Sequence, residues 1–118
     1  MTPTLDPEAF LPLTVPEYHV LLALGHDALH GYGMMQALEE RTGGADMLLP
    51  GTLYTTLARM VGKGLLDELA RPPEPGADAR RRYYRATELG LAVAKAESAR
   101  LARLLRVARA ADLAPDTP

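Results

Sequence analysis

One stretch of nine residues restricts the folds that this chain can adopt. Residues 71–79 read RPPEPGADA, and this density of proline and glycine excludes a helix or a central strand there. The flanking segments 65–70 and 80–86 are short and contain apolar residues or neighbouring tyrosines, which favour strands. We therefore predict a β-hairpin with a long loop at its tip, between helical segments on either side.

The first helix is predicted from its capping residues. Thr14 and Glu17 have the spacing of a capping box, and Pro16 fits a first helical turn because no backbone N–H is needed there. The apolar residues that follow have helical spacing as far as Leu24. Residues 1–13 contain three prolines and are predicted to form an arm with at most a short turn.

Two more helices are predicted before the hairpin. One covers residues 32–41 and ends at Thr42-Gly43-Gly44, because glycine adopts the left-handed conformation that closes a helix. The next covers residues 50–63 and is closed by Gly64. Its predicted buried stripe consists of Leu53, Leu57, Met60 and Val61.

The last helix is predicted over residues 87–111, with Thr87 as its N-cap. Its length, roughly 36 Å at 1.5 Å per residue, exceeds what a small domain can cover. Its apolar stripe would then be exposed in a monomer, and a second copy of the chain is the simplest cover. The predicted dimerisation residues are Leu89, Val93, Ala96, Leu101, Leu104, Leu105 and Ala108.

The predicted fold class is mainly α (α+β), a winged helix-turn-helix with a long C-terminal dimerisation helix. The predicted organisation is an N-terminal arm (1–13), a winged DNA-binding domain (14–86), the dimerisation helix (87–111) and a disordered tail (112–118).

Charge is distributed unevenly along the chain. Residues 1–49 have a net charge of −6, residues 50–85 of +3 and residues 86–118 of +1, which gives the total of −2. The basic segment coincides with the predicted third helix and the hairpin. A local positive patch attracts a polyanion even on an acidic protein.

Basic and hydroxyl side chains share the exposed face of the predicted third helix. At 100° per residue, the side opposite the buried stripe holds Thr52, Thr55, Arg59 and Lys63, with Tyr54 at its flank. Threonine and arginine can contact base edges, and cations can contact phosphates. The hairpin adds Arg80, Arg81, Arg82 and Arg85, which could contact the DNA backbone. Strand alternation would place Arg81, Tyr83 and Arg85 on one face and Arg82, Tyr84 and Ala86 on the other.

Five short motifs occur together in one order. They are LTVPEYHVLLAL (13–24), HGYG (30–33), PGTLY (50–54), GLL (64–66) and RRYYRATELG (81–90). With them, residues 13–111 resemble PadR-family transcriptional regulators, and the single C-terminal helix resembles the short subfamily. The resemblance implies a winged-helix dimer, usually a repressor, whose Tyr54 and hairpin arginines contact DNA. It also implies a small hydrophobic or phenolic effector, although the chain lacks the tryptophan with which some relatives bind flat drugs.

The sequence indicates no enzyme, cofactor or metal site. It has no cysteine, phosphate-binding loop or nucleophile elbow, and His19, His26 and His30 lack ligand spacing. No signal peptide or membrane-spanning run is apparent, so a cytoplasmic protein is expected. Two alternatives to a sequence-specific repressor remain: a winged-helix module that only binds other proteins, and a metal-sensing repressor.

Overall fold

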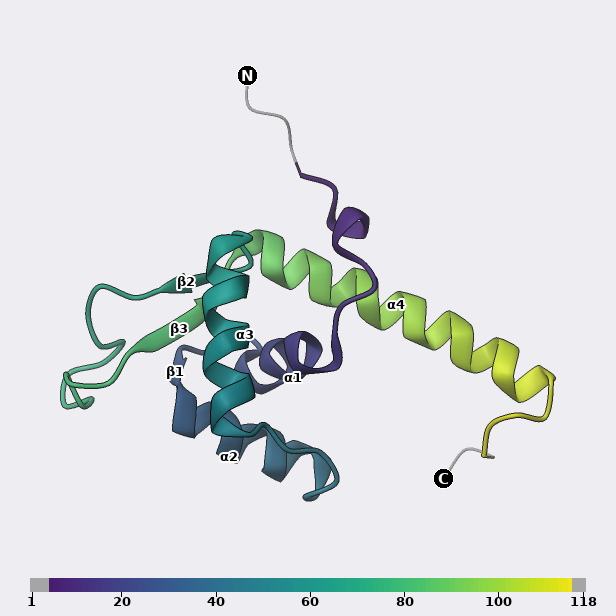
Figure 1. The fold of residues 1–118 in the computed structure, drawn as a ribbon, viewed down its shortest axis with the longest axis horizontal. Helices are drawn as coiled ribbons and strands as arrows, with labels where there is room; N and C mark the ends of the chain where they lie inside the picture. Colours follow the sequence, from purple (N-terminus) through teal and green to yellow (C-terminus); the bar gives the residue numbers. More distant parts are fainter. Residues whose placement is uncertain (1–4, 116–118) are drawn as a thin grey trace.

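The computed structural model describes residues 5–115 and has the predicted winged-helix fold (Figure 1). Three helices pack beside a small antiparallel sheet, and a long fourth helix extends away from them. The elements are η1 (Pro7–Phe10), α1 (Val15–Leu24), β1 (Leu29–His30), α2 (Gly31–Thr42), α3 (Pro50–Gly62), β2 (Leu66–Glu68), β3 (Tyr83–Ala86) and α4 (Glu88–Ala110). Among the described residues, no helix is long and apolar enough to cross a membrane.

The sheet contains a strand that the sequence pattern did not predict. Its order is β1-β3-β2, and both pairs are antiparallel. The strand β1 has only two residues, too few to give a periodic pattern. It pairs Leu29 with Tyr84 and His30 with Tyr83, and so attaches the start of α2 to the hairpin.

The hairpin strands are shorter than predicted. β2 covers residues 66–68 rather than 65–70, and β3 covers 83–86 rather than 80–86. Residues 80–82 therefore lie in the loop, and alternation cannot place their side chains. Within β3 the predicted alternation agrees with the structure, because Tyr84 and Ala86 belong to the core, whereas Tyr83 packs against the His30 ring and Arg85 is exposed. β3 is the central strand, with β1 on one side and β2 on the other.

The core lies between α1, α2, α3 and the first half of α4. Leu53, Leu57 and Met60 of α3 are buried as predicted, but Val61 is 37 % exposed. The fourth buried residue of α3 is instead Thr56, whose hydroxyl donates a hydrogen bond to the Thr52 carbonyl at 2.7 Å. The remaining core residues are Leu13, Val20, Leu21, Ala23, Leu24, Met34, Leu38, Leu48, Leu65, Leu66, Tyr84, Ala86 and Val93.

The predicted capping box is present and also binds α3. The Thr14 hydroxyl accepts the Glu17 N–H at 3.2 Å, and Glu17 Oε1 accepts the Thr14 N–H at 2.9 Å. The other carboxylate oxygen of Glu17 accepts from the Lys63 ammonium, also at 2.9 Å. Burial would raise the pKa of Glu17, but the Thr14 N–H and Lys63 together hold it below its ordinary value.

The N-terminal arm is attached to α4 by a second buried carboxylate. Glu97 accepts the backbone N–H of Leu13 at 2.8 Å and the guanidinium N–H of Arg100. The Arg100 hydrogen bond lowers the pKa of Glu97, and the Leu13 N–H adds to this against the effect of burial. Residues 5–13 are thus held against the middle of α4, and η1 packs on this helix (Figure 1). Residues 1–4 of the predicted arm lie outside the described part.

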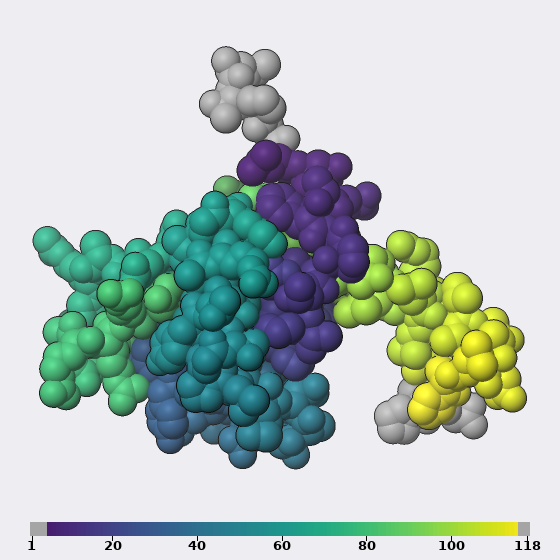
Figure 2. All heavy atoms as spheres, in the orientation of Figure 1, coloured from purple at the N-terminus to yellow at the C-terminus, as the bar shows by residue number. Residues whose placement is uncertain are grey.

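The first half of α4 packs tightly on the domain, and its second half does not. Val93 is fully buried in the core of its own chain, so its assignment to the dimer surface is corrected. Beyond residue 100 the helix stands apart as a separate projection (Figure 2). The Asp112 and Leu113 N–H groups bond to the last turn of the helix, so the predicted disordered tail does not begin at residue 112; residues 116–118 lie outside the described part.

Gly90 allows α4 to begin where it does. An added Cβ would lie 2.1 Å from the carbonyl oxygen of Leu65, whereas one at Gly62 would have nothing within 4 Å. Gly90→Ala is therefore expected to lower the free energy of unfolding by about 2–3 kcal/mol, because backbone has to shift. The matched variant Gly62→Ala should be neutral or stabilising by less than about 1 kcal/mol. Urea unfolding measures both, and equal effects would contradict the close contact.

Acid should destabilise the fold through its two buried carboxylates. Because the pKa values of Glu17 and Glu97 are lowered in the folded state, their contribution is complete above the ordinary glutamate pKa of about 4.3 and is lost as the pH falls through the folded values. Glu97→Gln should cost about 1–3 kcal/mol at pH 7 and less at pH 3. Urea unfolding between pH 7 and 3 tests this, with exposed Glu39→Gln as the control. A constant difference between Glu97→Gln and wild type would contradict it.

Candidate nucleic-acid interface

The outward face of α3 is open and bears small side chains. Thr52, Thr55 and Arg59 are exposed, as predicted from the helical wheel, and Tyr54 is 57 % exposed at the flank. The centre of this face also contains Gly51 and Ala58, whose value the sequence reasoning overlooked. An added Cβ at Gly51 would meet nothing within 4 Å. A helix with such a low central surface can approach the floor of a groove closely.

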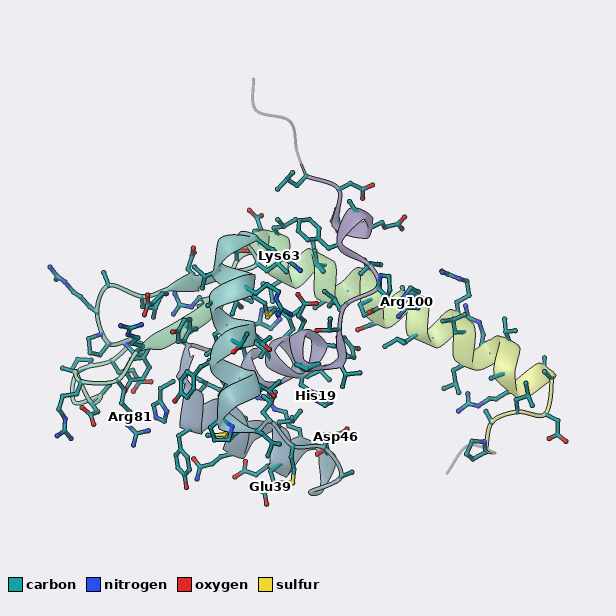
Figure 3. The ribbon with its side chains drawn as sticks, in the orientation of Figure 1. His19, Glu39, Asp46, Lys63, Arg81 and Arg100 are labelled. Atoms are coloured by element: carbon teal, nitrogen blue, oxygen red, sulfur yellow. The ribbon has the colours of Figure 1, made fainter. Side chains whose placement is uncertain are left out.

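The sequence predicted that Lys63 lies on this open face as a cation that can contact DNA, but the structure gives its ammonium a partner within the fold. Its ammonium lies at the far end of α3 and is bound to the buried carboxylate of Glu17 (Figure 3). The Lys63 charge is therefore paired with a carboxylate of its own chain. We therefore assign Lys63 a structural contact and leave it out of the proposed interface.

A hollow of about 570 Å³ connects the start of α3 with the wing, which we define as residues 66–86. Its walls combine aromatic rings, a thioether and guanidinium groups. The ring of Tyr54 lies over the start of α2, where a Cβ on Gly31 would be 2.9 Å from its hydroxyl oxygen, so this glycine allows close packing. The lining residues are His30, Gly31, Tyr32, Met35, Pro50, Tyr54, Arg80, Arg81 and Arg82.

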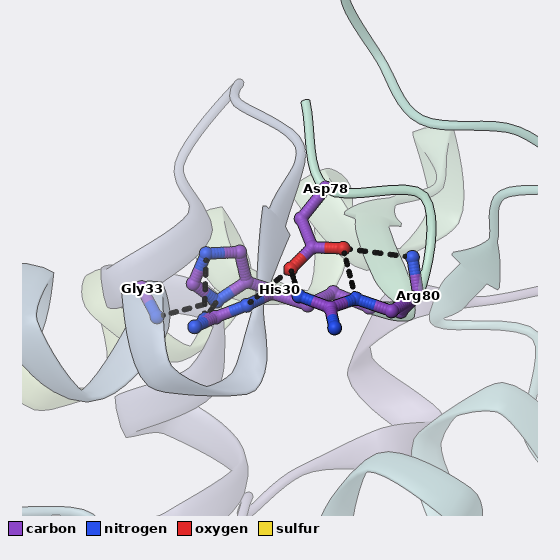
Figure 4. Close-up of polar contacts among 5 residues, drawn as sticks. His30, Gly33, Asp78 and Arg80 are labelled. Atoms are coloured by element: carbon purple, nitrogen blue, oxygen red, sulfur yellow. Dashed lines mark hydrogen bonds and ion pairs between the residues drawn. The ribbon is translucent and has the colours of Figure 1, made fainter. Parts of the chain in front are cut away.

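His30 attaches the wing to α2, a role that the sequence analysis missed. Its ring Nδ1 accepts the Gly33 N–H at 3.0 Å and so caps α2 (Figure 4). The Arg81 guanidinium lies 3.0 and 3.1 Å from the two ring nitrogens and 5.8 Å from the centre of the Tyr32 ring. Burial and the nearby Arg81 charge lower the pKa of His30. The sequence analysis began this helix at residue 32, whereas α2 begins at Gly31, which makes His30 its N-cap.

Asp78 orders the arginines at the base of the wing. Its carboxylate accepts the Arg80 backbone N–H at 2.9 Å and two guanidinium N–H groups of Arg80 at 3.2 Å (Figure 4). These hydrogen bonds lower the pKa of Asp78. Arg81 also lies within 3.7 Å of it. The structure thus divides the three arginines, because Arg81 is held against the domain while Arg80 and Arg82 point outward.

The outward arginines are available to an anion. The side chains of Arg80 and Arg82 are 91 % and 80 % exposed, and Arg82 pairs with Glu68 at 3.5 Å. Arg85 is exposed on β3, opposite Asp67 in the register. Exposed ion pairs of this kind are worth about 0–1 kcal/mol. A phosphate can therefore replace these carboxylates at small cost.

The predicted dimerisation residues divide into two groups. Leu101, Leu104 and Leu105 are 38 %, 48 % and 42 % exposed on the projecting half of α4, with Ala108 beside them. Leu89 and Ala96 are partly buried on the half that packs on the domain. Val107 and Leu113, which were not predicted, are exposed near the same end.

A comparison with family models identifies the chain. Residues 20–96 match the transcriptional regulator PadR-like family. The chain belongs to this family. The family assignment indicates a non-enzymatic DNA-binding regulator, in agreement with the open α3 face and the cationic wing. A search of curated proteins finds no match.

Three solved structures, two of them of PadR proteins, share the fold. A PadR family regulator from Clostridium difficile is 21 % identical with a TM-score of 0.69, over 81 % of this chain and 96 % of that one. RosR of H. salinarum is 28 % identical with a TM-score of 0.58, over 80 % and 79 %. Bacillus subtilis PadR, solved in complex with operator DNA, is 23 % identical with a TM-score of 0.54, over 67 % and 44 %.

None of the three histidines belongs to a recognisable metal centre. His19 pairs with Asp46 at 3.3 Å, and His30 caps α2. Within residues 5–115, the structure has no group of three or more histidine, cysteine or acidic side chains placed to hold a metal ion.

Lys63 and Arg82 should separate stability from DNA affinity. Lys63→Ala leaves the buried Glu17 carboxylate without its cation, so the free energy of unfolding should fall by about 1–3 kcal/mol. Arg82→Ala removes only an exposed pair and should change it by less than about 0.5 kcal/mol. Conversely, Arg82→Ala should flatten the salt dependence of binding to a random duplex by about one phosphate contact, and Lys63→Ala should not. A flatter salt dependence in stable Lys63→Ala would return Lys63 to the interface.

Proposed function

We propose that this protein is a sequence-specific transcriptional repressor that acts in the cytoplasm and binds a palindromic operator as a homodimer. The observation that carries the proposal is the continuity between the open face of α3 and the wing. The hollow bounded by Tyr54, His30 and Arg81 joins them into one surface. Membership of the PadR-like family supports the same reading.

In the proposed complex, α3 enters the major groove by its N-terminal end. Thr52 and Thr55 then lie at base edges. Arg59, about one turn beyond Thr55, reaches a guanine or a phosphate. Gly51 and Ala58 keep the central face low enough for this approach. The helix supplies the sequence discrimination, because the wing offers only charge.

The wing contacts the DNA backbone beside that groove. Arg80, Arg82 and Arg85 exchange their carboxylate partners for phosphates. Tyr54 donates its hydroxyl to a phosphate at the edge of the hollow, where Arg81 supplies positive charge. Because Arg81 is bound to the His30 ring and close to that of Tyr32, the wing is held in place before DNA arrives.

The second half of α4 forms the dimer interface. Leu101, Leu104, Leu105 and Ala108 share one helix face that the chain itself leaves uncovered. Pairing this face with a second copy covers it and places two α3 helices on one side of the dimer. Two-fold symmetry of the protein then requires a two-fold symmetric operator, with half-sites about one helical turn apart.

A small hydrophobic or phenolic effector would act where the two α4 helices meet the DNA-binding domains. A ligand there changes the angle between α4 and the rest of each subunit. The spacing of the two α3 helices changes with it, which lowers affinity for an operator of fixed spacing.

The double variant Leu104→Glu, Leu105→Glu tests the dimer and the operator together. Four glutamates in one interface should give monomers, and affinity for the upstream region of the protein's own gene should fall at least about 100-fold. Sedimentation measures assembly and footprinting measures binding. The matched control, Arg103→Glu with Arg106→Glu, places the same residues on the opposite face and should stay dimeric. A dimeric Leu104→Glu, Leu105→Glu variant would place the interface elsewhere, and an asymmetric wild-type footprint would contradict the palindrome.

A further inference from the structure

The residues just before α3 expose unusually apolar side chains. Met47 is 66 % exposed and Leu49 62 %, while Leu48 between them is 5 % exposed and belongs to the core. The buried side chain of Leu48 therefore anchors this turn to the domain core. Packing does not explain Leu49 or Met47.

Capping does not explain Leu49 either. Leu49 is the N-cap of α3 and makes no side-chain hydrogen bond there. In contrast, α1, α2 and α4 are each capped by a side chain, those of Thr14, His30 and Thr87. A Ser, Thr, Asp or Asn at this position would stabilise the helix by about 0.5–2 kcal/mol relative to an apolar residue. The chain forgoes this contribution only at the helix that faces DNA, which indicates a role in binding.

The apolar strip is continuous with the proposed DNA interface. Met47, Leu49 and Pro50 line a second hollow of about 310 Å³ against α2. This hollow shares Tyr32, Met35 and Pro50 with the hollow between α3 and the wing. A duplex that contacts Thr52 and Tyr54 is therefore next to Leu49.

We propose that Leu49 reads thymine through its C5-methyl group, with Met47 covering the outer side of the same contact. This rests on the proposed function. Neither side chain can donate to a phosphate or hydrogen-bond a base edge. The feature of the major groove that an apolar side chain can recognise is the thymine methyl. Leu49 is thus a specificity-determining residue that adds to Thr52, Thr55 and Arg59.

The test removes the methyl group from the DNA and the leucine from the protein. Duplexes that bind wild-type protein are first selected from a random pool. Thymines of one half-site are then replaced singly by deoxyuridine, which lacks only the methyl group. At one or two positions the wild type should bind the uracil duplex about fourfold more weakly, the factor for burying one methyl group.

The protein variant is Leu49→Ser, chosen because serine is a good N-cap. Its stability in urea should equal or exceed that of wild type, so unfolding does not explain weaker binding. It should bind the thymine and uracil duplexes equally. The matched control, Val61→Ser, changes an exposed apolar residue at the other end of α3 and should keep the thymine preference.

The outcomes separate this inference from the function on which it rests. Loss of the thymine preference in Leu49→Ser alone supports it. A preference of the same size in Leu49→Ser and wild type overturns it, as does the absence of any uracil effect in wild type. If wild type enriches no sequence from the pool, the proposed function itself fails and this inference with it.

Discussion

The carboxylate of Glu17 joins the start of α1 to the end of α3, and the direction in which α3 faces depends on this contact. One oxygen closes the capping box with Thr14, and the other holds the Lys63 ammonium. With its C-terminal end fixed in this way and Leu53, Leu57 and Met60 buried, α3 has little freedom to rotate. Its small central residues, with Thr52 and Thr55, are then left outward. Lys63, which the sequence analysis assigned to DNA, thus has a contact within the fold that holds the end of α3.

A second buried carboxylate and one glycine orient α4 in a comparable way. Glu97 attaches the arm through Leu13, and Gly90 lets the helix begin against the Leu65 carbonyl at the end of the α3–β2 turn. Both contacts lie in the first half of α4. The second half keeps its leucines exposed and is directed away from the wing (Figure 1), so a partner subunit can cover it without blocking α3.

The sequence predicted the elements with strong local signals and missed those that depend on long-range contacts. The capping box at Thr14, the buried stripe of α3 and the Pro-rich loop all act within a few residues; the capping box and the loop were confirmed, and the stripe was confirmed except at Val61. The strand β1 has no periodicity of its own and exists because Tyr83 and Tyr84 lie beside it. The roles of His30, Lys63 and Val93 likewise depend on residues at least 28 positions away, since His30 meets Arg81, Lys63 meets Glu17 and Val93 joins the core near Leu65. Helical periodicity says that such a residue is inside or outside, but not which distant group it meets.

The arrangement of carboxylates also explains how a chain of net charge −2 can approach DNA in one orientation. Two acids of the wing, Asp78 and Glu68, pair with Arg80 and Arg82, and phosphates could replace these carboxylates as partners of the arginines. Glu39 and Glu40 lie instead towards the C-terminal end of α2 and do not line the hollow between α3 and the wing, although Glu39 borders the second hollow beside Met47 and Leu49. In the proposed complex, a duplex would be attracted at the N-terminal ends of α2 and α3 and repelled at the C-terminal end of α2. Repulsion from a misplaced backbone restricts the docking angle as effectively as attraction to a correctly placed one, so in the proposed complex acidic side chains of α2 would contribute to recognition through repulsion.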